Sequence, residues 1–171
     1  MCNLTEEVTI HAFNNKRAIL AKLPSNPHVP SMLDVCENTD TNRAYLVLER
    51  AGDQTLEAFV AKHWSSLTIE LVRDITQQLL QAVDFLHTND VVHRDIKPDN
   101  IMLTLEPLCL KLIDFNIAQD LSQNPDLKGT NGVRVWSAPE TRSLFNYHRS
   151  CDLWSVGCIL YFLCTAKPLD Y

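Results

Sequence analysis

The chain has 171 residues, of which 46% are hydrophobic and 21% charged, and its formal net charge is −6. This length and composition are typical of one globular domain with a sizeable core. The negative charge, without clusters of Lys and Arg, argues against binding to nucleic acid, whose affinity depends on such clusters. The longest uncharged run, residues 153–166, is shorter than the about 20 apolar residues of a membrane span, so no membrane association is expected.

The N-terminus and the cysteines bear on location. Residues 1–7 contain neither the basic nor the apolar region of a secretory signal, which favours a cytoplasmic or nuclear protein. The six cysteines form no C-x-x-C pair, and most lie in apolar segments, where a reduced Cys behaves as a small hydrophobic residue. We therefore expect buried free thiols in preference to a disulfide or zinc framework.

The first third of the chain predicts a helix and a hairpin. Apolar residues in 13–23 fit a helix that Pro24 ends. Residues 32–36 and 45–49 are rich in strand formers and are separated by turn-forming residues, which predicts an antiparallel hairpin. A hinge is expected at residues 52–53.

The rest of the chain alternates helices with short strands. A short helix is expected from Leu56 to near Trp64, then a long amphipathic helix with Thr68 as its N-cap and its end at Asn89. Short apolar strands follow, then a turn-rich loop and an apolar helix from residue 153 to about 164. The expected fold class is α+β. The strands are predicted at 91–92, 101–103 and 110–113, and the loop at 116–137.

Four residues carry the chemistry: Asp95, Lys97, Asn100 and, after a predicted strand, Asp114. Asp114 and the amide oxygen of Asn100 are hard ligands of the kind that Mg²⁺ prefers alongside substrate phosphates. Lys97 would neutralise phosphate charge, and Asp95 is left to orient or deprotonate a hydroxyl. Taken singly, each residue would be an ordinary surface or core group, so the argument depends on the set.

Four motifs place this set in a known context. H-R-D-I-K-P-D-N at 93–100, D-F-N at 114–116, A-P-E at 138–140 and D-x-W-S-x-G at 152–157 occur in the order and spacing of a protein kinase. Over residues 12–171 the chain resembles the eukaryotic protein kinase superfamily of the Ser/Thr type, with a truncated catalytic domain. The resemblance implies transfer of the ATP γ-phosphoryl group to Ser or Thr of a protein substrate, with ATP and Mg²⁺ as cofactors.

The resemblance also implies the fold. It is an α+β protein-kinase-like fold, mainly the helical large lobe with a remnant of the small lobe. Residues 1–50 would be the small-lobe remnant, with a regulatory-type helix and two strands. Residues 51–171 would be an incomplete large lobe with the catalytic loop, the activation segment and a central apolar helix.

By the same resemblance, Asp95 is the catalytic base, and Lys97 steadies the γ-phosphate and favours Ser/Thr substrates. Asn100 and Asp114 are the Mg²⁺ ligands. Asp152 resembles the aspartate that braces the catalytic loop, and Arg94 the arginine that receives an activation-loop phosphate. The sites considered for that phosphate are Ser122, Ser137 and, as first choice, Thr130.

Residues 45–51 resemble the hinge strand. Leu48 would be the gatekeeper, the backbones of Glu49 and Ala51 would bind adenine, and Met102 would form the adenine floor. Ordinary strand packing is the alternative for these residues. His93 and Phe115 resemble members of the hydrophobic spine that links the two lobes.

The sequence departs from the family on the nucleotide side. Glycine occurs only at 52, 129, 132 and 157, which excludes a G-x-G-x-x-G loop, and no β3 lysine precedes the first helix. Lys16, or with a one-residue slip Asn15, stands where the glutamate partner of that lysine belongs. A solvated helix face is the favoured interpretation of Lys16, and replacement of the missing cation is the alternative. Asn116 replaces the glycine of D-F-G, and Asn tolerates left-handed backbone conformations.

These departures leave three functional hypotheses open. The chain is a serine/threonine kinase, a non-catalytic kinase-like binding or regulatory module, or a fragment of a longer active kinase. Because the sequence ends at Tyr171, soon after the apolar helix, that helix is expected to be partly uncovered. Such a face predicts a protein partner, aggregation or an incomplete sequence.

Overall fold

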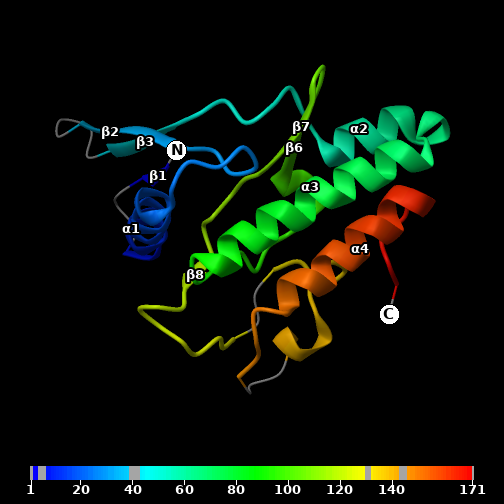
Figure 1. Ribbon diagram of the computed structural model, residues 1–171. Coiled ribbons are helices and arrows are strands. Elements are labelled where there is room, and N and C mark those ends of the chain that lie inside the picture. Colours follow the sequence, from blue (N-terminus) through cyan, green and yellow to red (C-terminus); the bar gives the residue numbers. More distant parts are fainter. Residues whose placement is uncertain (1, 4–6, 39–42, 130–131, 143–145, 171) are drawn as a thin grey trace.

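The computed structural model describes residues 2–3, 7–38, 43–129, 132–142 and 146–170. Figure 1 shows two groups of elements: α1 (Glu7–Lys22) with a small sheet at one end, and α2 (Leu56–His63), α3 (Ile69–Thr88) and α4 (Cys151–Thr165) at the other. None of the described helices is long and apolar enough to span a bilayer.

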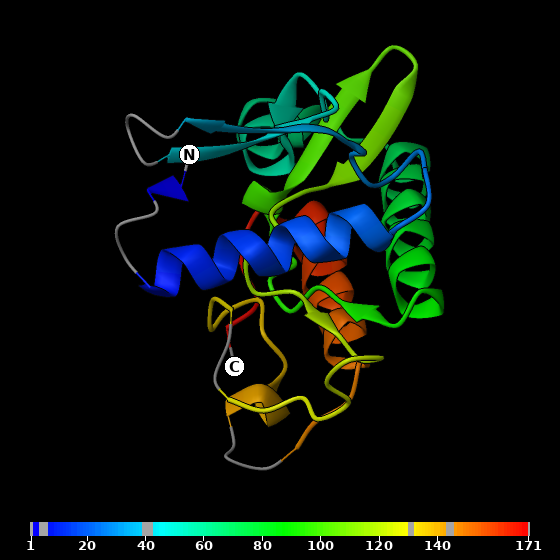
Figure 2. The ribbon, with the colours of Figure 1, turned by 90° about the vertical axis from the view of Figure 1, so that its left-hand side faces the viewer.

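The small sheet contains the predicted hairpin. β2 (Met32–Asn38) and β3 (Arg43–Leu48) pair antiparallel, and β1 (Cys2–Asn3) joins the other edge of β3. Helix α1 begins six residues earlier than the apolar pattern suggested, at Glu7 instead of residue 13, and ends at Lys22, before Pro24. Figure 2 shows α1 crossing in front of the other elements, between the small sheet and the segment that contains β8 (Gln119–Asp120).

The connection at Gly52 is close-packed against the second sheet. A Cβ at this position would lie 2.9 Å from the carbonyl oxygen of Leu103, and the next residue, Asp53, donates its amide to that same oxygen at 2.9 Å. The sheet itself has the strand order β4–β6–β7, with β4 at Gln54–Thr55, β6 at Ile101–Leu105 and β7 at Leu108–Leu112. Residues 52–53, where a hinge was predicted, therefore contact β6 directly.

Helix α3 follows the prediction closely. The Thr68 hydroxyl accepts the amide of Leu71 at 3.3 Å, and Asn89 is the C-cap residue. The apolar stripe is buried because it packs on β7 and α4, which lies beside α3 in Figure 1. At about 25 cal/mol per Å² of buried apolar surface, such a stripe stabilises the helix more than its intrinsic propensity does. The stripe consists of Val72, Ile75, Leu79, Val83 and Leu86.

One apolar cluster joins the two groups of elements. It includes Ile19 and Leu20 of α1, the α3 stripe, and Ile159 and Leu163 of α4. The other side of α4 carries four large side chains that are 38–50% exposed: Leu153, Trp154, Leu160 and Tyr161. The apolar helix is therefore partly uncovered.

The cysteine prediction is correct only in part. All five cysteines whose side chains are described are free thiols, and Cys151 and Cys158 are buried. Cys36 and Cys164 are exposed, because they lie on the outer faces of β2 and α4. Burial raises the pKa of the Cys151 thiol well above its ordinary value, so that this thiol stays protonated.

Candidate active site

The catalytic loop runs between β5 (Val91–Val92) and a 3₁₀ turn at Pro98–Asn100. The structure brings the three predicted catalytic residues together there. Lys97 Nζ lies 2.9 Å from Asp95 Oδ2, and Asn100 Nδ2 donates to that oxygen at 2.9 Å and to the Asp95 carbonyl at 2.8 Å. The Asp95 carboxylate is therefore held in one orientation by an ammonium and an amide.

Asp152, at the start of α4, holds the loop from below. Its Oδ2 accepts the amide of His93 and the Nε2 of His87, and its Oδ1 accepts the amide of Arg94, each at 2.9 Å. The Asp152 side chain is 1% exposed, so these donors replace the water that a buried carboxylate loses. One of these donors is the backbone amide of Arg94. The φ of Arg94 is 65°, a left-handed conformation that is strained for a residue with a Cβ.

His93 links this loop to the segment that carries Asp114. The imidazole is fully buried, and its Nε2 lies 2.9 Å from the carbonyl of Ile113, which assigns the proton to Nε2. Nδ1 then accepts the amide of Asp95 at 3.3 Å. Burial is the largest influence on the pKa of His93 and lowers it, so the ring stays neutral. Its edge meets the Phe115 ring at a centroid distance of 5.0 Å.

The backbone of Asp114 is left-handed, with a φ of 67°, whereas Asn116 is outside the left-handed region. Position 116 therefore does not need the tolerance of Asn for left-handed conformations. The amide of Asn116 instead donates back to Asp114 Oδ1 at 3.4 Å.

Lys16 is not on a solvated helix face, and the favoured prediction for it is wrong. Its side chain is 21% exposed, and Nζ lies 3.8 Å from Asp114 Oδ1 and 3.4 Å from Asn116 Oδ1. The reason is tertiary: α1 packs against residues 116–120, so this face of the helix is covered. The neighbouring Asn15 donates its Nδ2 to the carbonyl of Ala118 at 2.8 Å.

Comparison with known proteins identifies the family. The protein kinase domain model matches residues 4–171. This chain belongs to the eukaryotic protein kinase superfamily. It is 36% identical over 158 residues to cyclin-dependent kinase 4 of Mus musculus, across 89% of this chain and 52% of that protein. It is also 36% identical over 163 residues to serine/threonine-protein kinase TIO of Arabidopsis thaliana, across 95% of this chain and 12% of that protein.

A third kinase relative is serine/threonine-protein kinase 17A of Oryctolagus cuniculus, 34% identical over 151 residues. The alignment covers 86% of this chain and 38% of that protein. The chain spans about half the length of the cyclin-dependent kinase 4 proteins that it matches. Two of these three relatives are serine/threonine-protein kinases by name, which agrees with the type that Lys97 of the catalytic loop indicates.

The predicted hinge contacts strand β7 and Ser31, the residue before β2. The amide of Glu49 donates to the carbonyl of Ser31 at 2.9 Å, and its carboxylate accepts the amide of Ser31 at 3.2 Å and pairs with Lys111 Nζ at 2.9 Å. The hydrogen bond from Lys111 is the largest influence on the pKa of Glu49 and lowers it. Ala51 and Met102 are half-buried, and Met102 is paired across the sheet with Lys111.

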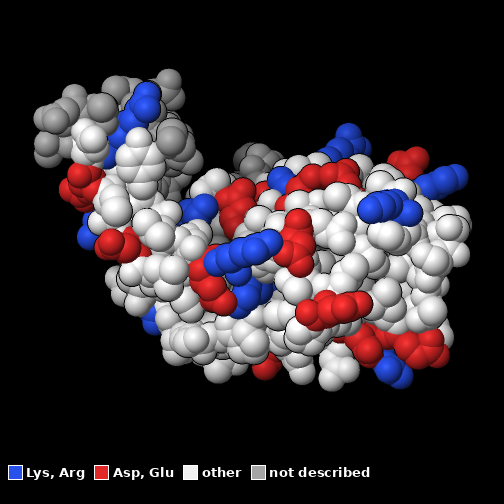
Figure 3. Space-filling view, turned by 90° about the horizontal axis from the view of Figure 1, so that it is seen from above, with Lys and Arg blue, Asp and Glu red and all other residues white. Residues whose placement is uncertain are grey.

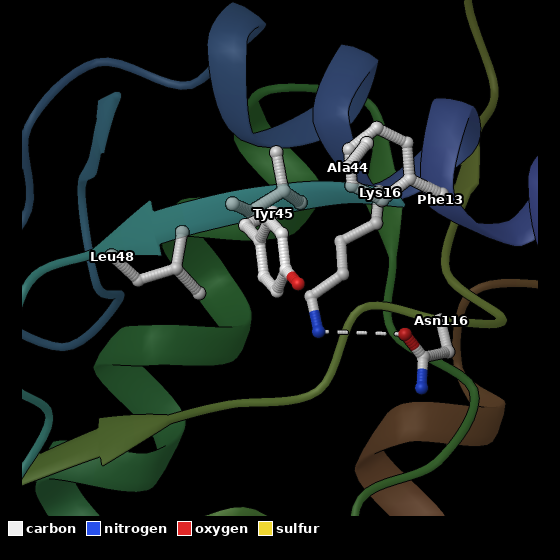
Figure 4. Close-up of a pocket in the computed structure, with 7 residues that line it drawn as sticks. Phe13, Lys16, Ala44, Tyr45, Leu48 and Asn116 are labelled. Carbon is white, nitrogen blue, oxygen red and sulfur yellow. Dashed lines mark hydrogen bonds between the residues drawn. The ribbon is translucent and has the colours of Figure 1, made fainter. Parts of the chain in front are cut away.

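A cavity of about 310 Å³ lies between α1, β3 and residue 116 (Figure 4). Leu48, the predicted gatekeeper, and Asn116 line it, and Lys16 projects across it. The predicted adenine contacts Glu49, Ala51 and Met102 do not line it. The full lining is Phe13, Lys16, Ala44, Tyr45, Leu46, Leu48 and Asn116.

The activation segment packs directly on the catalytic loop. Arg94 Nε donates to the carbonyl of Ile117 at 2.7 Å. Gly132 has a φ of 80°, and a Cβ there would lie 2.8 Å from the Arg94 carbonyl oxygen and 3.6 Å from Asp95 Oδ1. Thr130, the predicted phosphorylation site, lies outside the described residues.

The contacts that the sequence analysis did not predict include the Glu49–Lys111 pair, the His87–Asp152 contact and the ion pair between Lys22 and Asp120 at 2.7 Å. The single lysine of the apolar strand β7, Lys111, could have indicated the first of these contacts, because a buried charge needs a partner. The other two join residues 65 and 98 positions apart, and no local pattern reports such contacts.

Proposed function

We propose that this chain transfers the γ-phosphoryl group of ATP to Ser or Thr hydroxyls of protein substrates. The observation that carries the proposal is the oriented Asp95 carboxylate, held by Lys97 and Asn100 at 2.9 Å each. A carboxylate fixed in this way can orient a substrate hydroxyl and accept its proton. Lys97, bonded to Asp95, is placed to neutralise charge on the transferred group.

The donor set suits Mg²⁺. Asn100 donates to Asp95 through Nδ2 in both of its side-chain hydrogen bonds with the described residues, so the amide oxygen is the atom that can bind a cation. Asp114 would supply the carboxylate, and nucleotide phosphates the remaining ligands that Mg²⁺ usually keeps. The described residues contain no cluster of three acidic, His or Cys side chains that could hold a metal, and a shared Mg²⁺–phosphate site does not require one. When bound, Mg²⁺ would supply neutralisation of the phosphate charge.

The proposal extends to the adenine site, the activation segment and the exposed face of α4. Adenine would lie against Met102, with the Glu49 and Ala51 backbones as partners. Arg94 would receive a phosphate on Thr130, provided that its guanidinium leaves Ile117. The exposed face of α4 would be covered by a protein partner, and the free described thiols fit a cytoplasmic or nuclear setting.

The test is transfer of labelled phosphate from ATP with Mg²⁺ by the purified chain, scored on a generic acceptor protein and on the chain itself. Asp95→Asn and Asp114→Ala are expected to lower the rate at least about 100-fold, the usual contribution of general-base and electrostatic groups. Asp53→Ala is the matched control, because that carboxylate is 53% exposed and pairs only with exposed Arg50 in the described residues. Transfer that persists in both active-site variants would contradict the proposal.

The second candidate is a kinase-like binding module without turnover. The observation that favours it is the departure of two positions from the pattern that the resemblance implies, with Lys16 where a glutamate is expected and Asn116 where the glycine of D-F-G is expected. Nucleotide binding by the folded chain without transfer, in the presence of Mg²⁺, would favour this candidate.

On one face of the molecule, seen in Figure 3, Lys and Arg are scattered among Asp and Glu, and the described residues form no continuous basic area there. This face therefore gives no support for a nucleic acid as the substrate.

A further inference from the structure

We propose that Lys16, carried by helix α1, is the cation that binds the phosphates of the nucleotide in this kinase. The proposal rests on the proposed function, because it assigns a residue to the same nucleotide site. By the resemblance, position 16 corresponds to the glutamate that pairs with the β3 lysine. The proposal assigns to this position a positive charge and direct contact with phosphate.

The place of the ammonium is the first argument. Lys16 Nζ lies 3.8 Å from the carboxylate of Asp114, the proposed Mg²⁺ ligand. Figure 4 shows the side chain leaving α1 beneath β3 and crossing the cavity toward Asn116. A group at this position is beside the metal ligand and inside a cavity, which is where the charge of a polyphosphate has to be balanced.

The looseness of its contacts is the second argument. The distances of 3.8 Å to Asp114 and 3.4 Å to Asn116 are long for an ammonium that has three donors. Other lysines around the site are in tight pairs: Lys97 with Asp95 at 2.9 Å, Lys111 with Glu49 at 2.9 Å and Lys22 with Asp120 at 2.7 Å. Lys16 therefore retains hydrogen-bonding capacity that phosphate oxygens can use.

The fixed position of α1 is the third argument. Leu20, four residues after Lys16 and on the same face, is buried in the core, and Phe13, three residues before it, lines the cavity. On either side of Lys16, Asn15 bonds to Ala118 and Lys22 pairs with Asp120. The helix thus presents Lys16 to the site without the ordering of a loop, which lowers the entropic cost of binding.

Two departures from the family sequence meet at this point. Lys16 replaces a glutamate, Asn116 replaces the glycine of D-F-G, and the two side chains contact each other at 3.4 Å. A glycine at 116 would offer no side-chain acceptor. Asn116 therefore positions the ammonium before nucleotide arrives, at a contact long enough to be exchanged for phosphate.

The experiment compares binding of ATP, ADP and adenosine, with Mg²⁺, by the unmodified chain and by variants of Lys16. Lys16→Met is expected to weaken ATP and ADP about tenfold or more, the usual size of a charge-assisted contact, and to leave adenosine unchanged. Lys16→Arg should keep most of the affinity for ATP. Arg17→Met is the matched control, because it removes a neighbouring cation of α1 that is 47% exposed and points to Glu37.

Each other outcome overturns the proposal in a recognisable way. Equal ATP affinity in Lys16→Met leaves the proposed function standing and removes Lys16 from it. Equal losses for ATP and adenosine mean that Lys16 only supports the fold, and tighter ATP binding means that it blocks Asp114. If the methionine variant does not melt as a folded protein, Lys16→Gln, which keeps the length and polarity, takes its place. An unmodified chain that binds none of the three ligands overturns both proposals.

Discussion

The catalytic loop and the proposed nucleotide side of this chain differ in how tightly their side chains are held. The side-chain contacts of Asp95, Asn100 and Asp152 are 2.8–2.9 Å, and the two carboxylates are only 14% and 1% exposed. Around Asp114 and Lys16 they are 3.4–3.8 Å, beside a cavity of about 310 Å³. The comparison teaches that the fold fixes the groups proposed for proton transfer closely and leaves longer contacts around the groups proposed to bind nucleotide phosphates.

The largest effect is expected from Asp152→Ala, which breaks the tight side. The substitution leaves the buried amides of His93 and Arg94 without their acceptor, and each unsatisfied buried group costs about 1–3 kcal/mol. We expect the free energy of unfolding to fall by about 3 kcal/mol or more in urea titrations. Asp53→Ala serves as the control and should change it by less than about 1 kcal/mol, because that carboxylate is exposed. A similar loss in both variants would remove the contrast between the two sides.

An intermediate effect is expected from Gly132→Ala. The new Cβ would lie 2.6 Å from Ser137 Oγ and 2.8 Å from the Arg94 carbonyl, and a φ of 80° is strained for alanine. Such strain costs about 1–3 kcal/mol. We expect the activation segment of the variant to relieve this strain by moving away from Asp95. Thermal unfolding should show a lower midpoint, and phosphate transfer should fall while adenosine binding is kept. Gly157→Ala is the control, because its Cβ would meet nothing within 4 Å.

The smallest effect is expected on the nucleotide side, from Lys111→Met. The pKa of Glu49 is lowered in the folded state, first by the hydrogen bond from Lys111, so this contribution to stability is present above the ordinary carboxyl pKa and is lost as pH falls through the lowered value. Because the Glu49 side chain is 40% exposed, we expect less than about 1 kcal/mol. Unfolding titrations at pH 7 and pH 3.5 should show the unmodified chain losing more stability than the variant. An equal loss would mean that Lys111 does not control the titration of Glu49.

Helix α3 and the catalytic loop could be predicted from the sequence, because both depend on residues that are close together in the chain. The stripe of α3 repeats at the helical period and begins at a capping Thr68, so its span could be predicted closely. The set Asp95, Lys97 and Asn100 lies within six residues, and a loop that short keeps its side chains together. The short motifs predicted membership of the kinase superfamily, and the match of the protein kinase domain model to residues 4–171 confirms it.

What could not be predicted depends on contacts between distant residues. The orientation of Lys16 is set by α1 packing on residues about 100 positions later, and the helix pattern alone favoured solvent. The left-handed residue in 114–116 is Asp114 and not the substituted position 116, and the neighbouring Phe115 packs on His93, 22 residues earlier in the chain. The two-residue strand β8, within the predicted loop, exists through its pairing with Val91–Val92.

A lysine carried by a helix has a different mechanical character from one carried by a strand. Because side chains project outward from a helix axis, a rotation of α1 about that axis would swing the Lys16 ammonium away from Asp114 and Asn116. A strand paired within a sheet is held against such rotation by its ladder of hydrogen bonds. The contacts of Asn15 with Ala118 and of Lys22 with Asp120 resist that rotation. In the proposed role of Lys16, the resistance of α1 to rotation would therefore help to determine how strongly the domain binds a polyphosphate.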